Sequence, residues 1–400
     1  MRMNNDDRSN WRGANIARLR EAIRAECAST RRQRAQNPAF AFGSPRDVEL
    51  EITHRCNLHC AFCFQRTELE KAEGRSKTVP YGDLEVSMFE QILQDTRDDV
   101  AGLYIQGGEP LVHPQWPRFA RLLEADPRTL RLSTNGLSLA QQMESLVRIS
   151  GQLTIVLSVH GLRESIEAYY GNPGLYSKLL DNLGLLMRLK REQLFQGKVI
   201  IHCVLNEHLT GKLAAFVRWC EETGVDGVII SAPWYISQEA ASRMDIFFRD
   251  HLGWLMTIPQ QVKPSWYKFS FRLSPHSLEP VCAEIRDVAA REFAMPVQFH
   301  PAGDIEQMKR HLRGEPRTTV RRPFCLNIIK QLFVLPHGGV SACRVFQEFQ
   351  VGNLHQERAW EIWNGATFAR VRRIMNTAFD DGTWPIEVCA KCNLLSENQL

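Results

Sequence analysis

The sequence predicts an α/β protein whose parallel strands alternate with helices and form a curved, barrel-like sheet. Between residues 47 and 235, six short β-rich runs alternate with helical patterns, an order that is typical of βαβ units and a parallel sheet. Polar residues fall on one face of several runs, and Val, Ile and Leu dominate the other. A polar face on parallel strands indicates an interior that binds a polar ligand near the carboxyl ends of the strands.

The six predicted strands leave room for a helix between neighbours. In chain order they read DVELEIT, AGLYIQ, TLRLST, LTIVLSV, KVIIHCVL and GVIIS. Helical patterns such as LEVSMFEQILQDT and LYSKLLDNLGLLMRLKRE separate them. The polar positions that share one face are Glu49, Glu51, Thr53, Tyr104, Gln106, Arg131, Ser133, Thr154, Ser158, His160, His202 and Ser231. The alternative for this face is a buried polar layer whose side chains hydrogen-bond to one another and bind no ligand.

The sequence predicts a basic helix and a tail over residues 1–46. Nine Arg and four acidic residues stand in the first 36 positions. One helical stripe in this segment is apolar and is formed by Ile16, Leu19, Ile23 and Cys27. Two interpretations fit the helix. It is either an arm that binds a partner or leader peptide, or an amphipathic helix that packs on the barrel and keeps its basic face in solvent.

Two further units follow the barrel-like sheet of residues 47–235. Residues 236–320 are mainly helical in pattern and contain one extra strand, PVQFHP. Residues 321–400 hold a second group of cysteines among short strands and helices, which predicts a small C-terminal α+β domain. We therefore expect domain boundaries near residues 46, 235 and 320.

Composition narrows the class of protein. The formal charge is +4 and the basic excess lies in the N-terminal segment, so a nucleic-acid partner gains little support. The first ten residues lack the apolar core of a signal peptide, and no apolar run is long enough to span a bilayer, so we expect a cytoplasmic protein without a membrane partner. In a reducing compartment, eleven cysteines indicate metal binding or catalysis rather than disulfides.

Three cysteines, Cys56, Cys60 and Cys63, follow directly after the first predicted strand in the stretch THRCNLHCAFC. Thiolates hold iron-sulfur clusters, and a four-iron cluster bound by three local cysteines keeps one iron without a protein ligand. An open coordination position suits catalysis, whereas structural metal sites are closed. The position of the triplet predicts a cluster at the carboxyl end of the barrel, where such folds place their active sites.

The stretch CNLHCAFC resembles the signature of the radical S-adenosylmethionine (SAM) enzymes. In that family, the open iron of a [4Fe-4S] cluster binds the amino and carboxylate groups of SAM. The resemblance implies a partial (βα)6 TIM-like barrel over residues 47–235. It also implies that Cys56, Cys60 and Cys63 are the catalytic cluster ligands and that Phe62 lies at the cofactor.

Three further motifs resemble the SAM-binding segments of the same family, and each follows a predicted strand. QGGEP resembles the motif that holds the methionyl amino group; its glycines allow a close backbone approach, and its carboxylate suits an ammonium. STNG and LSVHG resemble segments that contact the ribose or the carboxylate. The cofactor-binding residues that this resemblance implies are Gly107, Gly108, Glu109, Pro110, Ser133, Asn135 and Ser158.

The second group of cysteines consists of Cys325, Cys343, Cys389 and Cys392. Between the first two, LFVLPHGGVSAC predicts a strand, a Gly-rich turn and a returning strand that brings two thiols together. With the CAKC pair and a helix around Trp363, the region resembles the SPASM/Twitch extension of radical SAM enzymes. The resemblance implies one auxiliary [4Fe-4S] cluster on all four cysteines. A zinc ribbon has a similar spacing and is the alternative.

The other cysteines and two aromatic residues are less informative. Cys203 faces away from the polar side of its strand, which favours a core position, and Cys220 fits helix packing. The sequence does not place Cys282. Either Cys203 or Cys282 is a candidate for the hydrogen-atom donor that a radical epimerase requires. Trp234 and Tyr235 follow the sixth strand and line either the substrate pocket or the rim of the barrel.

Together these resemblances imply a radical SAM oxidoreductase with three cofactors: SAM, the SAM-binding [4Fe-4S] cluster and the auxiliary [4Fe-4S] cluster. A 5'-deoxyadenosyl radical, formed by reductive cleavage of SAM, would remove a hydrogen atom from a substrate carbon. A closed auxiliary cluster favours a net oxidation, such as dehydrogenation or cross-linking, because it is able to accept an electron. Flavodoxin or ferredoxin is the expected electron donor.

The substrate class is a choice between a small molecule and a peptide. Peptide maturases often begin with a leader-recognition domain, and the segment before the first strand is shorter than such a domain. We therefore expect a small natural-product intermediate. The alternatives are a maturase of a ribosomally synthesised peptide, a redox-neutral epimerase and, in a different class, a non-catalytic iron-sulfur electron carrier.

Overall fold

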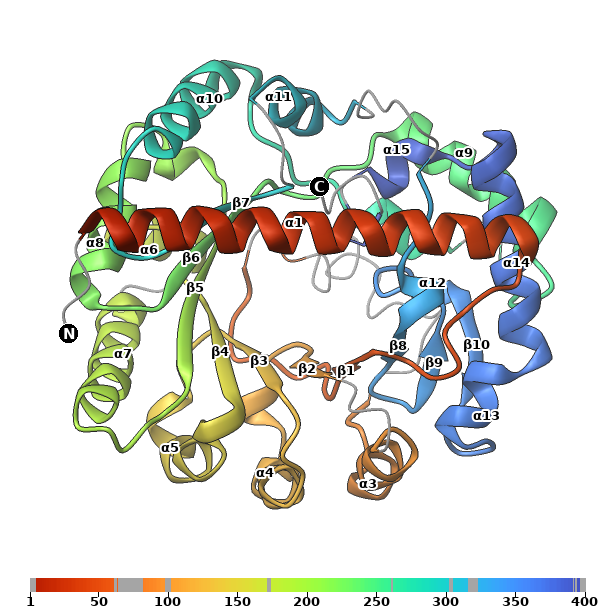
Figure 1. Cartoon of the computed structure of the whole chain (residues 1–400), viewed down its shortest axis with the longest axis horizontal. Coiled ribbons are helices and arrows are strands. Elements are labelled where there is room, and N and C mark those ends of the chain that lie inside the picture. The colour runs from red at the N-terminus through yellow and green to blue at the C-terminus, as the bar shows by residue number, and fades with distance from the viewer. Residues whose placement is uncertain are drawn as a thin grey trace.

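One mixed sheet runs through the molecule, and helices cover it (Figure 1). The computed structural model describes residues 5–60, 63, 82–97, 102–170, 174–259, 262–301, 305–315, 323–390, 392 and 394–395. In this part of the chain the sheet has ten strands in the order β10-β9-β8-β1-β2-β3-β4-β5-β6-β7, and it is not closed. The strands are β1 (Asp47–Glu51), β2 (Gly102–Gln106), β3 (Leu130–Thr134), β4 (Leu153–Ser158), β5 (Lys198–Val204), β6 (Gly227–Ser231), β7 (Val297–His300), β8 (Gln331–Val334), β9 (Gly339–Ser341) and β10 (Gln350–Asn353).

The parallel half of the sheet has the elements that the sequence predicts. Each of the six β-rich runs forms one strand, from β1 to β6, and sequential strands pair in parallel. The extra strand in PVQFHP is β7, which pairs in parallel with β6. The α/β class and the partial barrel are therefore confirmed. The longer helices are α1 (Asn5–Gln36), α3 (Val86–Asp95), α4 (Trp116–Glu124), α5 (Leu139–Arg148), α6 (Arg163–Tyr170), α7 (Leu175–Arg191), α8 (Leu213–Thr223), α9 (Gln238–Phe247), α10 (Pro275–Ala289), α11 (Ile305–Arg313) and α14 (Ala366–Asp381).

The two faces of the parallel strands differ in burial as the alternation predicts. Leu50 and Ile105 on the apolar face belong to the hydrophobic core and are fully buried. On the polar face, Gln106 and Ser158 are only half-buried at the carboxyl ends of their strands. Other positions of the polar face are buried, among them Glu49, Glu51 and Thr53. A buried carboxylate needs partners within the protein, and those of Glu49 are Gln106 of β2 and two residues of the C-terminal region, Gln331 and Arg344.

The C-terminal strands extend the barrel sheet rather than forming a sheet of their own. Strand β8 pairs in parallel with β1, and β9 and β10 follow as antiparallel neighbours. The short helices of this region are α12 (Asn327–Lys330), α13 (Ala359–Asn364) and α15 (Ile386–Cys389). The sequence predicts the hairpin of β8 and β9 but contains no signal that its first strand joins the first strand of the barrel.

The N-terminal helix α1 crosses one face of the molecule (Figure 1). Near its end, Arg34 donates from Nε to Asn376 Oδ1 at 2.8 Å, and its guanidinium lies 4.7 Å from the ring centroid of Phe324. Ile23 and Cys27 pack against the core, whereas the side chains of Ile16 and Leu19 lie outside the described part. Arg34 continues the stripe of Ile23 and Cys27 and is buried against the C-terminal region, whereas Arg24 and Arg32 on the other side of the helix are exposed.

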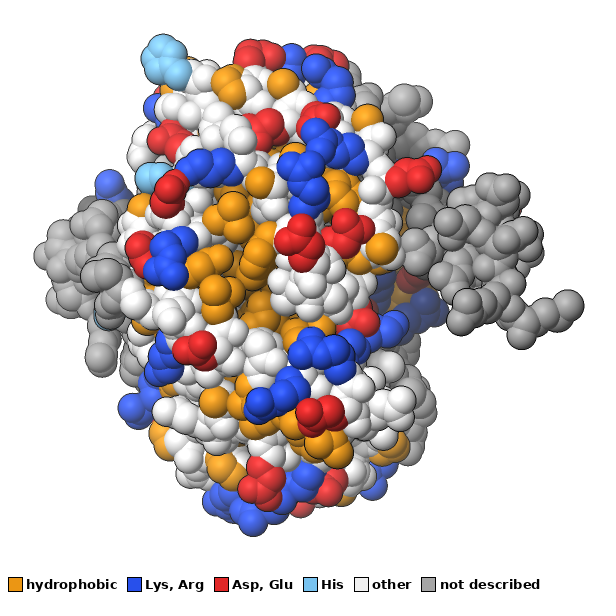
Figure 2. Space-filling model, turned by 90° about the vertical axis from the view of Figure 1, so that its left-hand side faces the viewer, with side chains coloured by type: hydrophobic (Ala, Val, Ile, Leu, Met, Phe, Trp, Pro, Cys, Tyr) orange, Lys and Arg blue, Asp and Glu red, His pale blue; other side chains and the backbone are white. Residues whose placement is uncertain are grey.

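The surface mixes both signs of charge on the face shown in Figure 2. Lys and Arg side chains alternate there with Asp and Glu, and hydrophobic side chains gather in a band at the centre. This distribution agrees with the near-neutral charge of the chain outside its N-terminal segment. Within the described residues, no helix is long and apolar enough to cross a membrane.

The β1–β8 pairing makes truncation a test of the fold. We expect a fragment of residues 1–320 to aggregate, because it exposes the backbone edge of β1 and the apolar surface that the C-terminal helices cover. Size-exclusion chromatography of the fragment beside the full chain measures this. A monomeric fragment with one cooperative melting transition would contradict the expectation.

Candidate functional site

The first cysteine group lies in the loop that follows β1. Cys56, Cys60 and Cys63 are all half-buried, so their thiols are accessible to a ligand from the carboxyl end of the barrel. The loop is shaped by short-range contacts: the Cys63 N–H donates to the Cys60 carbonyl at 3.1 Å, and the Leu58 N–H donates to Cys56 Sγ at 3.4 Å. Phe62 lies outside the described residues, so its expected place at the cofactor stays a prediction.

The QGGEP motif lies directly against this loop. The Gly108 N–H donates to the Thr53 carbonyl at 2.8 Å, and the Glu109 N–H donates to the Arg55 carbonyl at 2.7 Å. A Cβ atom at Gly108 would stand 2.3 Å from the Arg55 carbonyl oxygen, and Gly107 has a φ of +143°. Glycine is needed here because the second motif touches the backbone of the cysteine loop. From the sequence we expect these glycines to allow a close approach of the backbone to the ligand, and that contact stays a prediction.

The Glu109 carboxylate is bound within the protein. It accepts hydrogen bonds from Thr134 Oγ1 at 2.8 Å, from the Asn135 N–H at 2.6 Å and from the Leu111 N–H at 3.1 Å. Burial raises the pKa of Glu109 to about 7, and these hydrogen bonds oppose the rise. Glu109 thus ties the QGGEP motif to the STNG motif of the next strand. Its expected contact with the methionyl ammonium stays a prediction.

The remaining motifs stand at the ends of adjacent strands. Asn135, after β3, donates from Nδ2 to Asn57 Oδ1 in the cysteine loop at 2.7 Å. Ser133 lies on β3, and Ser158 on β4 is paired with His202 in register. Pro110, the last residue of its motif, begins a buried 3-10 turn, Pro110–Val112. The structure therefore places the four motifs at the carboxyl ends of β1, β2, β3 and β4, which are neighbours in the sheet.

Sequence reasoning gave no specific role to His202 and Tyr170. The Nε2 atom of His202 lies 2.9 Å from Ser231 Oγ. Burial lowers the pKa of His202 to about 4, so the ring is neutral near pH 7. Tyr170 is buried, and its hydroxyl has no hydrogen-bond partner among the described residues. Burial raises the pKa of Tyr170 well above its usual value, and the nearby Cys60 raises it further. Cys203 is fully buried, as its strand parity predicts.

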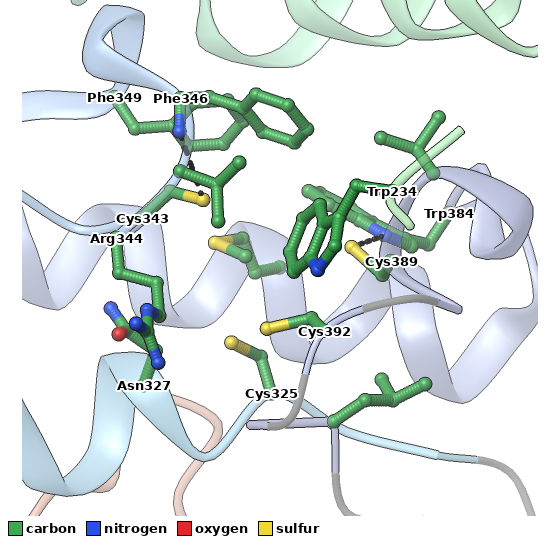
Figure 3. A pocket seen from close by; sticks show the side chains of 14 residues that line it. Trp234, Cys325, Asn327, Cys343, Arg344, Phe346, Phe349, Trp384, Cys389 and Cys392 are labelled. Carbon is green, nitrogen blue, oxygen red and sulfur yellow. Dashed lines mark hydrogen bonds between the residues drawn. The ribbon is translucent and has the colours of Figure 1, made fainter. Parts of the chain in front are cut away.

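The second cysteine group surrounds one pocket (Figure 3). Cys325 precedes α12, Cys343 follows β9, Cys389 ends α15, and Cys392 comes three residues later. Aromatic and aliphatic side chains complete the lining, among them Trp234, Phe346, Phe349 and Trp384. Burial in this apolar pocket raises the thiol pKa at all four positions, to about 12 at Cys325. Thiolates at these positions are therefore stable only beside a positively charged ligand.

The four thiols of this pocket are able to ligate a four-iron cluster. A zinc ion holds four sulfur atoms at about 2.3 Å, which forces the thiols close together. Among the described residues, no group of three Cys, His, Asp or Glu side chains is arranged to hold one metal ion. The four thiols nevertheless face the same pocket. A four-iron cluster gives each of four such thiolates its own iron.

Three side chains connect this pocket to its surroundings. Trp234, three residues after β6, lines the pocket and packs on Phe269 at 5.4 Å between ring centroids. Arg344 pairs with Glu49 of the barrel at 2.7 Å. Trp384 donates from Nε1 to Cys389 Sγ at 3.0 Å. The barrel mouth and the second cysteine group are therefore adjacent. The sequence placed Trp234 at this mouth but gave no signal for the other two contacts.

Comparison with known families agrees with this geometry. The model of the radical SAM superfamily matches residues 50–216, and the model of an iron-sulfur cluster-binding domain, SPASM, matches residues 325–393. The chain therefore contains a radical SAM domain and a SPASM-type domain. These two domains imply SAM and two [4Fe-4S] clusters as cofactors.

Individual relatives are distant. The chain is 28% identical over 334 residues to the pre-heme d1 synthase of Dinoroseobacter shibae, which covers 82% of this chain and 76% of that protein. It is 22% identical over 359 residues to a PqqA peptide cyclase of Xanthomonas campestris, covering 87% and 79%. SuiB of Streptococcus suis bound to SAM has a similar fold, with a TM-score of 0.56, 14% identity and coverage of 82% and 68%. SuiB is also known in complex with its precursor peptide SuiA.

The contact between QGGEP and the cysteine loop makes Gly108 a sensitive position. Gly108→Ala forces the backbones of the QGGEP motif and the cysteine loop apart. A displacement of about 1 Å at a bound reactant slows a reaction about 100-fold. We expect that loss in the formation of 5'-deoxyadenosine from SAM with dithionite as reductant. Gly184→Ala in α7, where a Cβ atom meets nothing within 4 Å, is the control. A Gly108→Ala rate equal to that of the control would contradict this expectation.

Proposed function

We propose that this radical SAM enzyme removes a hydrogen atom from a substrate carbon and completes a net oxidation of a small natural-product intermediate. Reductive cleavage of SAM at the cluster held by Cys56, Cys60 and Cys63 supplies methionine and a 5'-deoxyadenosyl radical. The protein orients SAM through the motifs that follow β2, β3 and β4. Their proposed contacts are the backbone at Gly107 and Gly108 and the side chains of the two later motifs.

One observation carries the oxidative assignment: Trp234, which follows strand β6 of the barrel, lines the second cysteine pocket. All four cysteines are available as ligands, so the auxiliary cluster has no open iron and its role is to carry electrons. Its pocket is shared with a residue that follows a barrel strand, which brings an electron acceptor close to the proposed substrate. A redox-neutral epimerase has no need of such an acceptor, and Cys203, one candidate hydrogen donor, is buried on the apolar face.

The electrons and hydrogens of this proposal balance. An external reductant, for which we propose flavodoxin or ferredoxin, supplies the electron that cleaves SAM. The substrate loses one hydrogen atom to the 5'-deoxyadenosyl radical, which becomes 5'-deoxyadenosine, and then loses a proton. The second substrate electron passes to the auxiliary cluster and from there to an external acceptor. The substrate is thereby dehydrogenated or cross-linked by two electrons.

The small-molecule assignment draws on the pre-heme d1 synthase, which is more similar in sequence than the PqqA peptide cyclase over comparable lengths. A peptide substrate is the second candidate. It draws on that peptide cyclase and on the SuiB complex with SuiA. A non-catalytic electron carrier gains no support from a chain that keeps the SAM-binding motifs beside a three-cysteine loop. We also propose that the enzyme acts in the cytoplasm.

Removal of the three thiols of the first group tests the radical chemistry. We expect the variant with Ala at Cys56, Cys60 and Cys63 to form no 5'-deoxyadenosine while it keeps the second cluster, because these thiols belong to a separate loop. Chromatographic detection of 5'-deoxyadenosine after reduction measures this. Cys220→Ala, which changes a buried cysteine away from both sites, is the matched control. SAM cleavage by the triple variant would refute the assignment.

Replacement of Cys389 and Cys392 by Ala tests the oxidative role. We expect partial or full retention of SAM cleavage and a loss of oxidised product, because the second substrate electron has no acceptor. Iron and sulfide should fall from about eight of each per chain to about four, the count for one four-iron cluster. Unchanged turnover by this variant, or one zinc in place of four irons in the wild type, would remove the basis for an electron acceptor.

A further inference from the structure

We propose that Trp384 is a positioning residue that raises the reduction potential of the auxiliary cluster through a hydrogen bond to Cys389. The inference rests on the proposed function, because it assumes that the four-cysteine pocket holds a redox cluster. The observation behind it is the contact between Trp384 Nε1 and Cys389 Sγ, at 3.0 Å (Figure 3). The indole N–H is only a donor, so the direction of this bond is fixed.

The surroundings hold the Trp384 ring in place. The ring stacks on Phe379 at 5.0 Å between centroids with an interplanar angle of 27°, and it meets the edge of Phe247 at 4.5 Å. Its main-chain N–H donates to the Ala378 carbonyl at 3.1 Å, and the residue is 5% exposed. A ring packed in this way has little freedom to turn, so the N–H stays directed at the sulfur in both oxidation states of the cluster.

A donor at a cluster sulfur favours the reduced state. Reduction adds one negative charge to the cluster and its thiolates, and a hydrogen bond to an anionic acceptor strengthens as that charge grows. The effect is larger in a dry, apolar pocket than in water because the local dielectric constant is low. Besides the four cysteines, Asn327 and Arg344, the pocket is lined by aromatic and aliphatic side chains, and Trp384 itself is 5% exposed, so its N–H faces little competition from solvent.

Backbone N–H groups also donate to the cluster ligands. The Phe346 N–H donates to Cys343 Sγ and the Leu394 N–H to Cys392 Sγ, both at 3.4 Å. These contacts are longer than the Trp384 bond, and side-chain replacement does not remove them. Because Trp384 donates from its side chain, a substitution removes its hydrogen bond and leaves the backbone contacts in place. A higher potential suits a cluster that takes an electron from a substrate radical.

The decisive experiment is a reductive titration of Trp384→Phe, which keeps an aromatic ring and loses the N–H. The full-length chain carries Ala at Cys56, Cys60 and Cys63, so that only the auxiliary cluster titrates. We expect the equilibrium constant for reduction to fall about tenfold, which is 59 mV for a one-electron couple. Trp234→Phe is the matched control, because Trp234 lines the same pocket and, among the described contacts, donates no hydrogen bond to sulfur. The potential of the cluster in this variant should stay near that of the wild type.

The outcomes separate the inference from the proposed function. An intact four-iron cluster whose potential is unchanged in Trp384→Phe overturns the inference alone. Zinc or no metal in the wild-type pocket overturns both. If Trp384→Phe fails to hold iron, Trp384→Leu carries the test, since it stays apolar and also lacks the N–H. A tenfold fall of the equilibrium constant in Trp384→Leu supports the hydrogen bond, and a potential close to that of the wild type opposes it.

Discussion

The buried carboxylate of Glu49 is the contact on which the arrangement of the two cysteine groups depends. Glu49 lies on β1 and is fully buried, and burial raises its pKa. It pairs with Arg344, accepts a hydrogen bond from Gln106 of β2 at 2.5 Å and accepts another from Gln331 of β8. A charge in this position is tolerated only when such partners are present, so the barrel and the C-terminal strands must assemble together.

This assembly fixes the distance between the two sites without a flexible linker. The first cysteine loop leaves the carboxyl end of β1, and Arg344 stands beside Cys343 at the second pocket. Both sites are therefore positioned by one strand and its ion pair, although more than 250 residues separate Cys56 from Cys325 along the chain. An electron transfer between substrate and auxiliary cluster requires a fixed separation, and a shared sheet supplies it more reliably than packing between independent domains.

Local patterns in the sequence were sufficient for the parallel strands and for the order of the motifs, because alternation and strand-end position are properties of short segments. The β1–β8 pairing was not predictable in this way, since it joins segments far apart and leaves no periodic signal in either. The reason for the glycines at 107 and 108 was also missed: their neighbour is the backbone at Thr53 and Arg55, which only the folded chain reveals. Trp384 stands five residues before Cys389, a spacing that predicts nothing.

The apolar character of the second pocket has a consequence for folding. Burial raises the thiol pKa at Cys325 to about 12, and each neighbouring thiolate adds repulsion at Cys389. Four thiolates therefore gather here only when irons compensate their charge, and metal binding then contributes directly to the stability of the folded chain. Because β8 also completes the sheet beside β1, assembly of the auxiliary cluster should stabilise the barrel itself. Cluster loading and barrel stability should therefore be coupled through the β1–β8 pairing.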